Sequence, residues 1–255
     1  METQHRFSRL VEIMAKLRGE GGCPWDREQT HESIRPYCIE EAYEVVQAID
    51  DRDPISLKEE LGDLMLQVVF HAQMAQEAGT FAIDDVLETL NEKLVRRHPH
   101  VFAPTPGEAV TDAQTVLERW AELKKKEGRQ STLDGVPKNL PGLLCATRMG
   151  EKAANIGFDW AKSEDVAEKV SEELAEIAKA KTPEHREEEF GDLLFALCQW
   201  GRHEKIDAET ALRRANAKFE RRFRAMERFA SEENRALSAM SMEELNALWD
   251  RAKAL

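Results

Sequence analysis

The stretch "EEEFGDLLFALCQW" (187–200) sets three glutamates, a glycine and an aspartate directly before a run of apolar residues. An earlier stretch, "EELGDLMLQVVFHA" (59–72), combines the same features. In both, apolar residues recur every three or four positions, the spacing of one face of an α-helix. Each stretch therefore predicts a helix with a buried apolar stripe and an acidic edge. The stripes are Phe190, Leu193, Leu194, Leu197 and Cys198, and Leu61, Leu64, Met65, Val68, Val69 and Ala72.

The rest of the chain also reads as helix. Glycine and proline gather in a few breaks, "RGEGGCPWD" (18–26), "APTPGEA" (103–109) and "LDGVPKNLPG" (133–142). Alternating strand patterns of useful length are absent between them. The sequence predicts an all-α fold.

Several features recur in the second half of the chain, in the same order and at nearly one offset. They are Glu60/Asp63 with Glu189/Asp192 (129 residues), "NEKLVRR" (91–97) with "NAKFERR" (216–222) (125 residues), and Trp120/Lys124 with Trp249/Lys253 (129 residues). This internal repeat predicts two tandem helical-bundle domains, residues 1–128 and 129–255.

Composition limits the classes of function. The chain has 255 residues, of which 42% are hydrophobic and 33% charged, and its formal net charge is −13. No apolar run approaches the roughly 20 residues of a membrane helix, and the N-terminus lacks the apolar region of a signal peptide. The acidic balance argues against a general nucleic-acid binder. The four cysteines show no metal-like spacing, so we expect reduced thiols and a cytoplasmic protein.

Paired acidic residues are the main chemical signal. Residues three positions apart lie on one face of a helix, and such pairs occur on two consecutive predicted helices in each half. If those helices pack as an antiparallel hairpin, four carboxylates converge and repel unless a cation joins them or some become protonated. The pairs are Glu41/Glu44 and Glu60/Asp63 in the first half, and Glu173/Glu176 and Glu189/Asp192 in the second.

For any single pair a plainer interpretation stays open, because acidic residues also favour helix N-termini and glutamate-rich faces are usually solvated. The recurrence of paired acids on consecutive helices, twice in one chain, favours a metal site. Oxygen ligands without histidine or cysteine suit Mg²⁺, with Mn²⁺ as a substitute, better than Zn²⁺. Glycine inside a helix costs about 1 kcal/mol relative to alanine. A need for small volume would explain that cost, so we expect Gly62 and Gly191 to allow the two helices to approach closely.

Basic and aromatic residues follow the acidic pairs in each half. Lys218 and Arg222 share a helix face, with Arg221 at its edge. A polyphosphate held by a metal requires such cations, although pairing with nearby glutamates is an equal alternative. Trp249 could stack on a base or ribose, or simply pack between helices. The first-half counterparts are Lys93, Arg97 and Trp120.

These motifs together carry a resemblance over nearly the whole chain. They are "GGCPWDREQT", "EEAYEV", "EELGDLMLQVVFHAQMA", "RRHPHVF", "NIGFDW", "EEFGDLLFA" and "NAKFERRFRAMER". The chain resembles the MazG family of nucleoside triphosphate pyrophosphohydrolases in its long, tandem-domain form. The resemblance implies a dimerising helical bundle that binds Mg²⁺ and hydrolyses nucleoside triphosphates to monophosphate and pyrophosphate.

The resemblance also implies roles for individual residues. Metal ligands fall on Glu173, Glu176, Glu189 and Asp192, with Glu41, Glu44, Glu60 and Asp63 as the matching N-terminal set. Nucleotide contacts fall on Lys218, Arg222, Trp249 and Lys253, with Arg221 beside them and Lys93, Arg97, Trp120 and Lys124 as counterparts.

The expected reaction is attack of water on the α-phosphorus, a choice that comes from the resemblance because carboxylate spacing does not distinguish it from attack at the γ-phosphorus. Glu172 or Glu188 is expected to act as general base, and the sequence does not choose between them. One alternative is a non-catalytic regulatory protein that binds a nucleotide or a helical partner, with a structural metal. A plain helical scaffold is another.

The two halves differ after the basic pair. Pro99 follows Arg97 by two residues, and proline stops or kinks a helix. In the second half "RRFRAMERFASEEN" (221–234) runs on without proline or glycine. We therefore expect Lys218 and Arg222 to be held more rigidly, and the C-terminal half to carry most of the activity.

Overall fold

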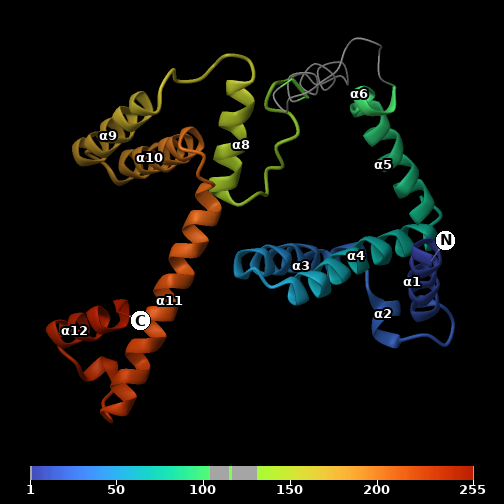
Figure 1. Ribbon diagram of the computed structural model, residues 1–255, viewed down its shortest axis with the longest axis horizontal. Helices are drawn as coiled ribbons and strands as arrows, with labels where there is room; N and C mark the ends of the chain where they lie inside the picture. Colours follow the sequence, from blue (N-terminus) through green and yellow to red (C-terminus); the bar gives the residue numbers. More distant parts are fainter. Residues whose placement is uncertain (1, 104–114, 117–130, 255) are drawn as a thin grey trace. The chain divides into compact units, whose positions relative to one another are not determined.

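A computed structural model describes residues 2–103, 115–116 and 131–254 of the chain. The regular elements in these residues are helices (Figure 1), so the all-α prediction is confirmed. The chain divides into two compact units, residues 1–111 and 112–255. The predicted domain boundary, between residues 128 and 129, lies outside the described residues and stays a prediction. None of the described helices has the length and apolar character needed to cross a lipid bilayer.

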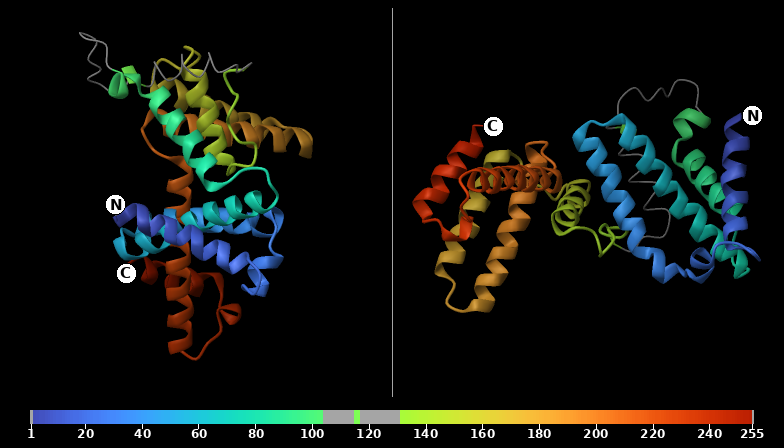
Figure 2. Two further views of the ribbon diagram at one scale, coloured as in Figure 1. Left: turned by 90° about the vertical axis from the view of Figure 1, so that its right-hand side faces the viewer. Right: turned by 90° about the horizontal axis from the view of Figure 1, so that it is seen from below.

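The N-terminal unit is built on a hairpin of its two longest helices, α3 and α4, which lie side by side (Figures 1 and 2). Helix α1 packs against α4, and Met14, Ile34 and Val69, each 1% exposed, form the centre of the core. The helices of this unit are α1 (Glu2–Arg18), α2 (Pro24–Glu28), α3 (His31–Asp51), α4 (Pro54–Glu77), α5 (Ile83–Arg97) and α6 (Pro99–Phe102).

The turn between α3 and α4 decides which acidic residues face each other. Arg52, at the end of α3, has a φ of 56°, the left-handed conformation that commonly ends a helix. Asp53 then caps α4 by accepting hydrogen bonds from two backbone N–H groups of its first turn, and Pro54 takes the first helical position. Because the chain reverses within so few residues, Glu41 and Asp63 lie about equally far from the turn on facing helices.

The C-terminal unit repeats the hairpin with α9 and α10 and adds a long helix, α11. Thr182 caps α10 and Pro183 follows, so this turn also combines a capping side chain with proline. Helix α12 folds back on the second half of α11, whereas α8 and α10 lie at its beginning (Figure 1). The helices are α8 (Gly142–Ala154), α9 (Ser163–Lys179), α10 (Pro183–His203), α11 (Ala208–Glu232), the short 3₁₀ helix η1 (Leu237–Ala239) and α12 (Met242–Lys253).

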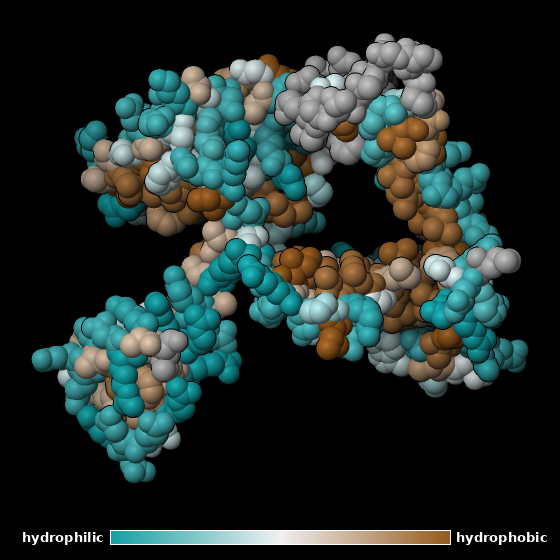
Figure 3. Space-filling view, in the orientation of Figure 1, coloured by the Kyte–Doolittle hydropathy of each residue, from teal (hydrophilic) through white to brown (hydrophobic). Residues whose placement is uncertain are grey.

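The apolar stripes of the two hairpins are only partly buried, so the prediction of wholly buried stripes was wrong. Val69 and Ala72 in α4, and Leu193 and Cys198 in α10, are buried. Other members face outward because the described residues of each unit cover only one side of its hairpin (Figure 3). The outward members are Leu61, Met65 and Val68, which are 47–49% exposed, and Phe190, Leu194 and Leu197, which are 38–54% exposed.

Two further expectations about local structure have different outcomes. Among the described residues, Gly62 and Gly191 do not mark close helix contacts, because a Cβ atom at either position would meet no neighbouring atom within 4 Å. The helix ends agree with the sequence: α5 stops at Arg97, whereas α11 continues unbroken through Lys218 and Arg222.

Candidate functional site

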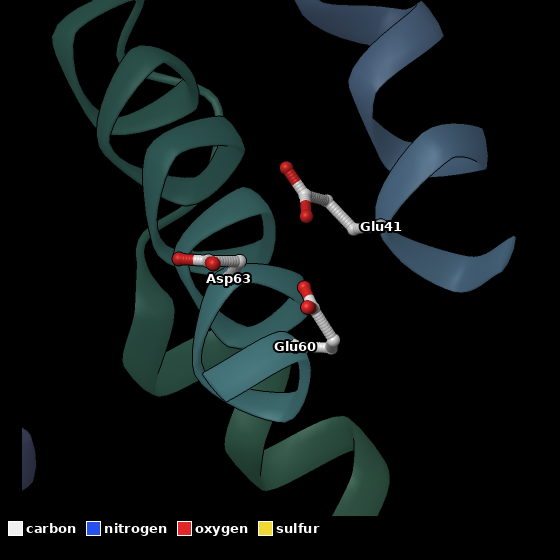
Figure 4. A group of neighbouring side chains, drawn as sticks. All are labelled: Glu41, Glu60 and Asp63. Atoms are coloured by element: carbon white, nitrogen blue, oxygen red, sulfur yellow. The ribbon is translucent and has the colours of Figure 1, made fainter. Parts of the chain in front are cut away.

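Three acidic side chains from two helices converge in the N-terminal unit. Glu41 of α3 and Glu60 and Asp63 of α4 each place a carboxylate oxygen within 4.8 Å of the others. Figure 4 shows Glu41 reaching from its helix toward the two acids of α4. Glu44, one turn further along α3, is close enough to Glu41 to raise its pKa and so borders this N-terminal carboxylate group (Glu41, Glu60 and Asp63).

Electrostatic strain within the N-terminal carboxylate group appears in its pKa values. Burial raises the pKa of Glu41, and the negative charges of Asp63 and Glu44 raise it further. The pKa of Glu60 is also raised, first by burial and then by Glu44 and Asp63. Desolvation and like charges both disfavour the ionised form, so a cation placed among these oxygens would reverse the shift.

An unsatisfied amide lies beside the same group. Gln67 of α4 is 8% exposed, and its Nε2 donates a long hydrogen bond of 3.4 Å to Glu41. Its Oε1 is buried and has no hydrogen-bond partner within the part of the chain that the structure describes. Buried carbonyl oxygens are normally satisfied by a donor, an ordered water or an ion. The orphaned oxygen of Gln67 fits a hydrated cation among the neighbouring carboxylates.

The C-terminal unit contains a second convergence of three acids. Glu173 and Glu176 of α9 and Glu189 of α10 each offer a carboxylate oxygen within 4.8 Å of the others. Glu173 is buried, and the pKa of Glu176 is raised by burial and then by Glu189. Asp192 lies one turn beyond Glu189, is exposed, and falls outside this C-terminal carboxylate group (Glu173, Glu176 and Glu189).

Two basic side chains, which the sequence did not lead us to expect, contact acids of the C-terminal carboxylate group. Lys169 Nζ is 2.6 Å from Glu173 Oε1 and 3.1 Å from Glu172 Oε1. Hydrogen bonds to Glu173 and then Glu172 raise the pKa of Lys169. His185 Nε2 is 2.8 Å from Glu189 Oε1. Residues four apart on a helix are neighbours, so the spacing in "EKVSEE" (168–173) and "EHREEE" (184–189) was an available signal.

The two candidate general bases have different surroundings. Glu172 is exposed and paired with Lys169 at the edge of the C-terminal carboxylate group. Glu188 is exposed on α10, directly before Glu189. Both remain candidates.

The predicted nucleotide contacts of the C-terminal unit lie on α11 and α12. The Arg222 guanidinium is 5.8 Å from the centre of the Trp249 ring. The centre of the Phe219 ring is 5.2 Å from the centre of the same Trp249 ring. Trp249 is half-buried against the core between α11 and α12, so packing accounts for one side of its ring. Lys218 and Arg221 are on the same helix as Arg222. Lys253 Nζ is 2.8 Å from Asp250.

Within the C-terminal unit, these basic and aromatic residues are separated from the acids. Glu189 precedes the end of α10 at His203 by 14 residues, which is about 21 Å of helix at 1.5 Å per residue. Figure 1 shows α10 leading away from α11 at a wide angle. A single C-terminal unit therefore does not bring Arg222 and Trp249 to its own carboxylate group.

The counterparts in the N-terminal unit are only partly described. Lys93 and Arg97 lie in the last two turns of α5. Trp120 and Lys124 lie outside the described residues.

Sequence comparison gives these features a family. The profile described as "MazG nucleotide pyrophosphohydrolase domain" matches residues 29–102, which include the N-terminal carboxylate group. The chain is 47% identical over 250 residues to the "Nucleoside triphosphate pyrophosphohydrolase/pyrophosphatase MazG" of Thermotoga maritima, covering 97% of this chain and 95% of that protein. The chain belongs to the MazG family. The resemblance inferred from the motifs is confirmed.

Other relatives of this MazG chain are similar over the same length. The "Nucleoside triphosphate pyrophosphohydrolase" of Escherichia coli K12 is 44% identical over 259 residues, covering 98% of this chain and 97% of that protein. The "Uncharacterized protein YabN" of Bacillus subtilis is 46% identical over 256 residues and is about twice as long, with 52% of its length matched. Both carboxylate groups of the MazG chain therefore fall inside the matched regions.

The donor atoms of both carboxylate groups fit a hard divalent cation. Each group offers only carboxylate oxygens, from two helices, at a spacing that one ion can bridge. Magnesium is typically held by one or two carboxylates and keeps several waters, which the partial exposure of all these acids except buried Glu173 permits. In the C-terminal group Lys169 already supplies part of the counter-charge, and His185 pairs with Glu189. Both groups of the MazG chain can hold a metal ion.

Proposed function

We propose that this MazG chain hydrolyses nucleoside triphosphates to nucleoside monophosphate and pyrophosphate, with Mg²⁺ as cofactor, in the cytoplasm. The observation that carries the proposal is the convergence of three carboxylates from two helices in each unit. It is supported by similarity over 97% of the chain to a Thermotoga protein named for this activity. A carboxylate-only donor set favours Mg²⁺, and Mn²⁺ would substitute for it.

The proposed ligands include two acids that border the groups. Glu44 is close enough to Glu41 to raise its pKa, and Asp192 lies one helical turn from Glu189. Small side-chain rotations would let both join an ion bound by their neighbours. The proposed sets are Glu41, Glu44, Glu60 and Asp63, and Glu173, Glu176, Glu189 and Asp192.

The chemistry is divided among the side chains. A bound Mg²⁺ would grip the triphosphate oxygens and lower the pKa of a coordinated water. Glu172 or Glu188 accepts the proton of the water that attacks the α-phosphorus. The bond from the α-phosphorus to the bridging oxygen breaks, and pyrophosphate leaves with its charge neutralised by Lys218 and Arg222. In this proposal Trp249 supports the nucleoside by stacking.

Within one C-terminal unit the carboxylate group is separated from the basic residues of α11 and α12, and this separation favours a homodimer. Phe190 and Leu194 of α10, and Phe219 and Phe223 of α11, are large apolar side chains that are 39–57% exposed. A second copy of the chain placed against these faces would remove them from water. It would also bring the α11 and α12 residues of one copy to the carboxylates of the other. We propose that the working site is completed in this way.

The test is product analysis on a panel of ribonucleoside and deoxyribonucleoside triphosphates in ¹⁸O-labelled water. Attack at the α-phosphorus gives labelled monophosphate and unlabelled pyrophosphate, and activity disappears in EDTA. Nucleoside diphosphate plus phosphate would place the attack at the γ-phosphorus and overturn the proposed reaction. Mg²⁺-dependent binding without turnover would instead show a regulatory protein, and no dependence on Mg²⁺ at all would show a scaffold.

Mixing two inactive variants tests the shared site. Glu189→Gln keeps the basic residues, and Arg222→Ala keeps the carboxylates. If each site draws on both copies, mixed dimers contain one intact site, and activity returns to about a quarter of the native value after random exchange of subunits. Absence of recovery, with sedimentation showing that dimers of the two variants exchange, would mean that each chain completes its own site.

A further inference from the structure

Three potential metal ligands form a connected group on the α3–α4 hairpin, apart from the carboxylates. His71 of α4 lies between two residues of α3: its Nδ1 is 2.7 Å from His31 Nδ1, and its Nε2 is 3.3 Å from Cys38 Sγ. The planes of the two imidazole rings are within 5° of parallel, and their centroids are 5.0 Å apart. His31 and Cys38 are seven positions apart in α3, about two helical turns, so both face α4.

The hairpin fold does not require these side chains. The internal repeat pairs Glu41 with Glu173 and Glu60 with Glu189, and the same alignment gives the counterparts in the C-terminal hairpin. They are Ser163 for His31, Val170 for Cys38 and Trp200 for His71. The C-terminal hairpin forms with none of the three ligands, so their convergence is a property of the N-terminal hairpin alone.

The protonation states argue against a reactive thiolate. Burial raises the pKa of the Cys38 thiol, and the charge of Glu41 acts in the same direction. Burial also lowers the pKa of His71, with His31 adding to the shift. A nucleophilic cysteine needs the opposite surroundings, a lowered thiol pKa beside a cation. A neutral imidazole next to a thiol is instead the pair that a borderline-soft metal ion binds, after displacing the thiol proton.

We propose that Cys38 Sγ and His71 Nε2 bind a divalent ion of the zinc class, with His31 as the hydrogen-bond partner that orients His71. Zinc–sulfur and zinc–nitrogen distances of about 2.3 Å and 2.0–2.1 Å in a tetrahedral site place the two ligand atoms about 3.5 Å apart. The observed separation is 3.3 Å. The remaining positions on the ion take water.

The second nitrogen of His71 has the partner that such a site needs. A histidine that binds metal through one ring nitrogen usually donates the N–H of the other to an acceptor, which fixes the tautomer. The Nδ1 atoms of His71 and His31 are 2.7 Å apart, so with His71 Nε2 on the ion, His71 Nδ1–H would donate to the unprotonated Nδ1 of His31. Binding converts the Cys38 thiol to a thiolate and releases its proton to solvent. Sulfur and nitrogen ligands separate this site chemically from the all-oxygen groups, which select Mg²⁺.

Cobalt absorption tests the proposal on the full-length chain. Co²⁺ is titrated in the presence of excess Mg²⁺, which occupies oxygen sites, and the near-ultraviolet thiolate-to-cobalt band is followed. We expect a saturable band with one equivalent of Co²⁺, which Zn²⁺ abolishes. Cys38→Ser should remove the band, His71→Gln should weaken Co²⁺ binding at least about 100-fold, and His31→Gln about 10-fold.

Matched controls separate this site from the other cysteines and from the carboxylates. Cys145→Ser removes another half-buried free thiol, and Glu60→Gln changes the N-terminal carboxylate group; both variants should keep the band. If Cys38→Ser loses helicity, Cys38→Val replaces it, since valine occupies the corresponding position of the C-terminal hairpin. A native chain without the band, or a band that survives in the folded Cys38 variant, would overturn the proposal.

Discussion

The two carboxylate groups share one frame and differ in what balances their charge. Each gathers three acids from a hairpin of two helices. In the C-terminal hairpin Lys169 and His185 pair with two of the acids. The repeat places Tyr37 and Ser56 at the corresponding positions of the N-terminal hairpin. There no basic side chain takes those positions, and the pKa values of two acids, Glu41 and Glu60, are raised, against that of Glu176 alone in the C-terminal group.

The comparison shows that the same helical hairpin can hold its acids with basic side chains beside them or without. A lysine beside buried Glu173 fixes the position of that carboxylate before any ligand arrives, and fixed groups lose less free energy to reorganisation during catalysis. The N-terminal group depends more on a cation from solution. Together with the unbroken helix under Lys218 and Arg222, this favours the C-terminal unit as the main catalytic unit of the proposed enzyme.

The largest expected effect comes from removing acids in one unit at a time. Glu189→Gln/Asp192→Asn should lower kcat at least about 100-fold, the cost of losing a group that stabilises charge in a transition state. Glu60→Gln/Asp63→Asn should lower it much less. Release of pyrophosphate measures the effect, and circular dichroism checks that both variants are folded.

Single variants sharpen the same comparison. Glu189 belongs to the C-terminal carboxylate group and Asp192 only borders it, so Glu189→Gln should be the more damaging of the two. If the N-terminal double variant abolishes turnover and the C-terminal one spares it, the assignment of the catalytic unit is reversed.

The basic residues should have a smaller effect, mainly on binding. Lys218→Ala and Arg222→Ala should each raise KM about 10-fold, the loss of one charge-assisted contact to phosphate, with a fall in kcat if the contact tightens in the transition state. Lys93→Ala in α5 is the matched variant and should change KM little. Unchanged kinetics together with a lower Tm would assign Lys218 and Arg222 to salt bridges.

The hairpins show how far sequence could predict this site. Acids three apart on two consecutive helices are a local signal, and three of the four acids predicted in each hairpin converge. Lys169 and His185 were also within reach, four positions from their partners. By contrast, the contact between His31 and His71 depends on the register of one helix against another, 40 residues apart. The exposure of Met65 and Phe190 depends on which helix faces other elements cover. Helical periodicity predicts neither this coverage nor the register of one helix against another.

Lys169 should matter to stability when metal is absent. In EDTA, Lys169→Met leaves the buried carboxylate of Glu173 without its cation. Losing one partner of a buried pair is costly, but Lys169 is 35% exposed, so we expect about 1 kcal/mol rather than more. Urea unfolding measures this, with Lys179→Met, an exposed lysine of the same helix, as control. The stabilisation on adding Mg²⁺ should be larger in Lys169→Met than in the native chain, and an equal gain would contradict a role for Lys169 as counter-charge.

The smallest expected effect is a pH dependence of stability, to which Glu176 contributes in the C-terminal group and two acids contribute in the N-terminal group. The pKa values of Glu41 and Glu60 are raised from 4.5, so between that value and the higher folded ones the native state holds more protons than the unfolded state. Stability in EDTA should then fall as pH rises through this window, because its slope follows the difference in bound protons. Glu41→Gln should flatten the fall, whereas Glu12→Gln on α1 should not. Mg²⁺ should also flatten it, since a bound cation favours the ionised acids. Parallel profiles for the native chain and Glu41→Gln would mean that the repulsion is already relieved within the protein, and the contrast between the two carboxylate groups would lose its electrostatic basis.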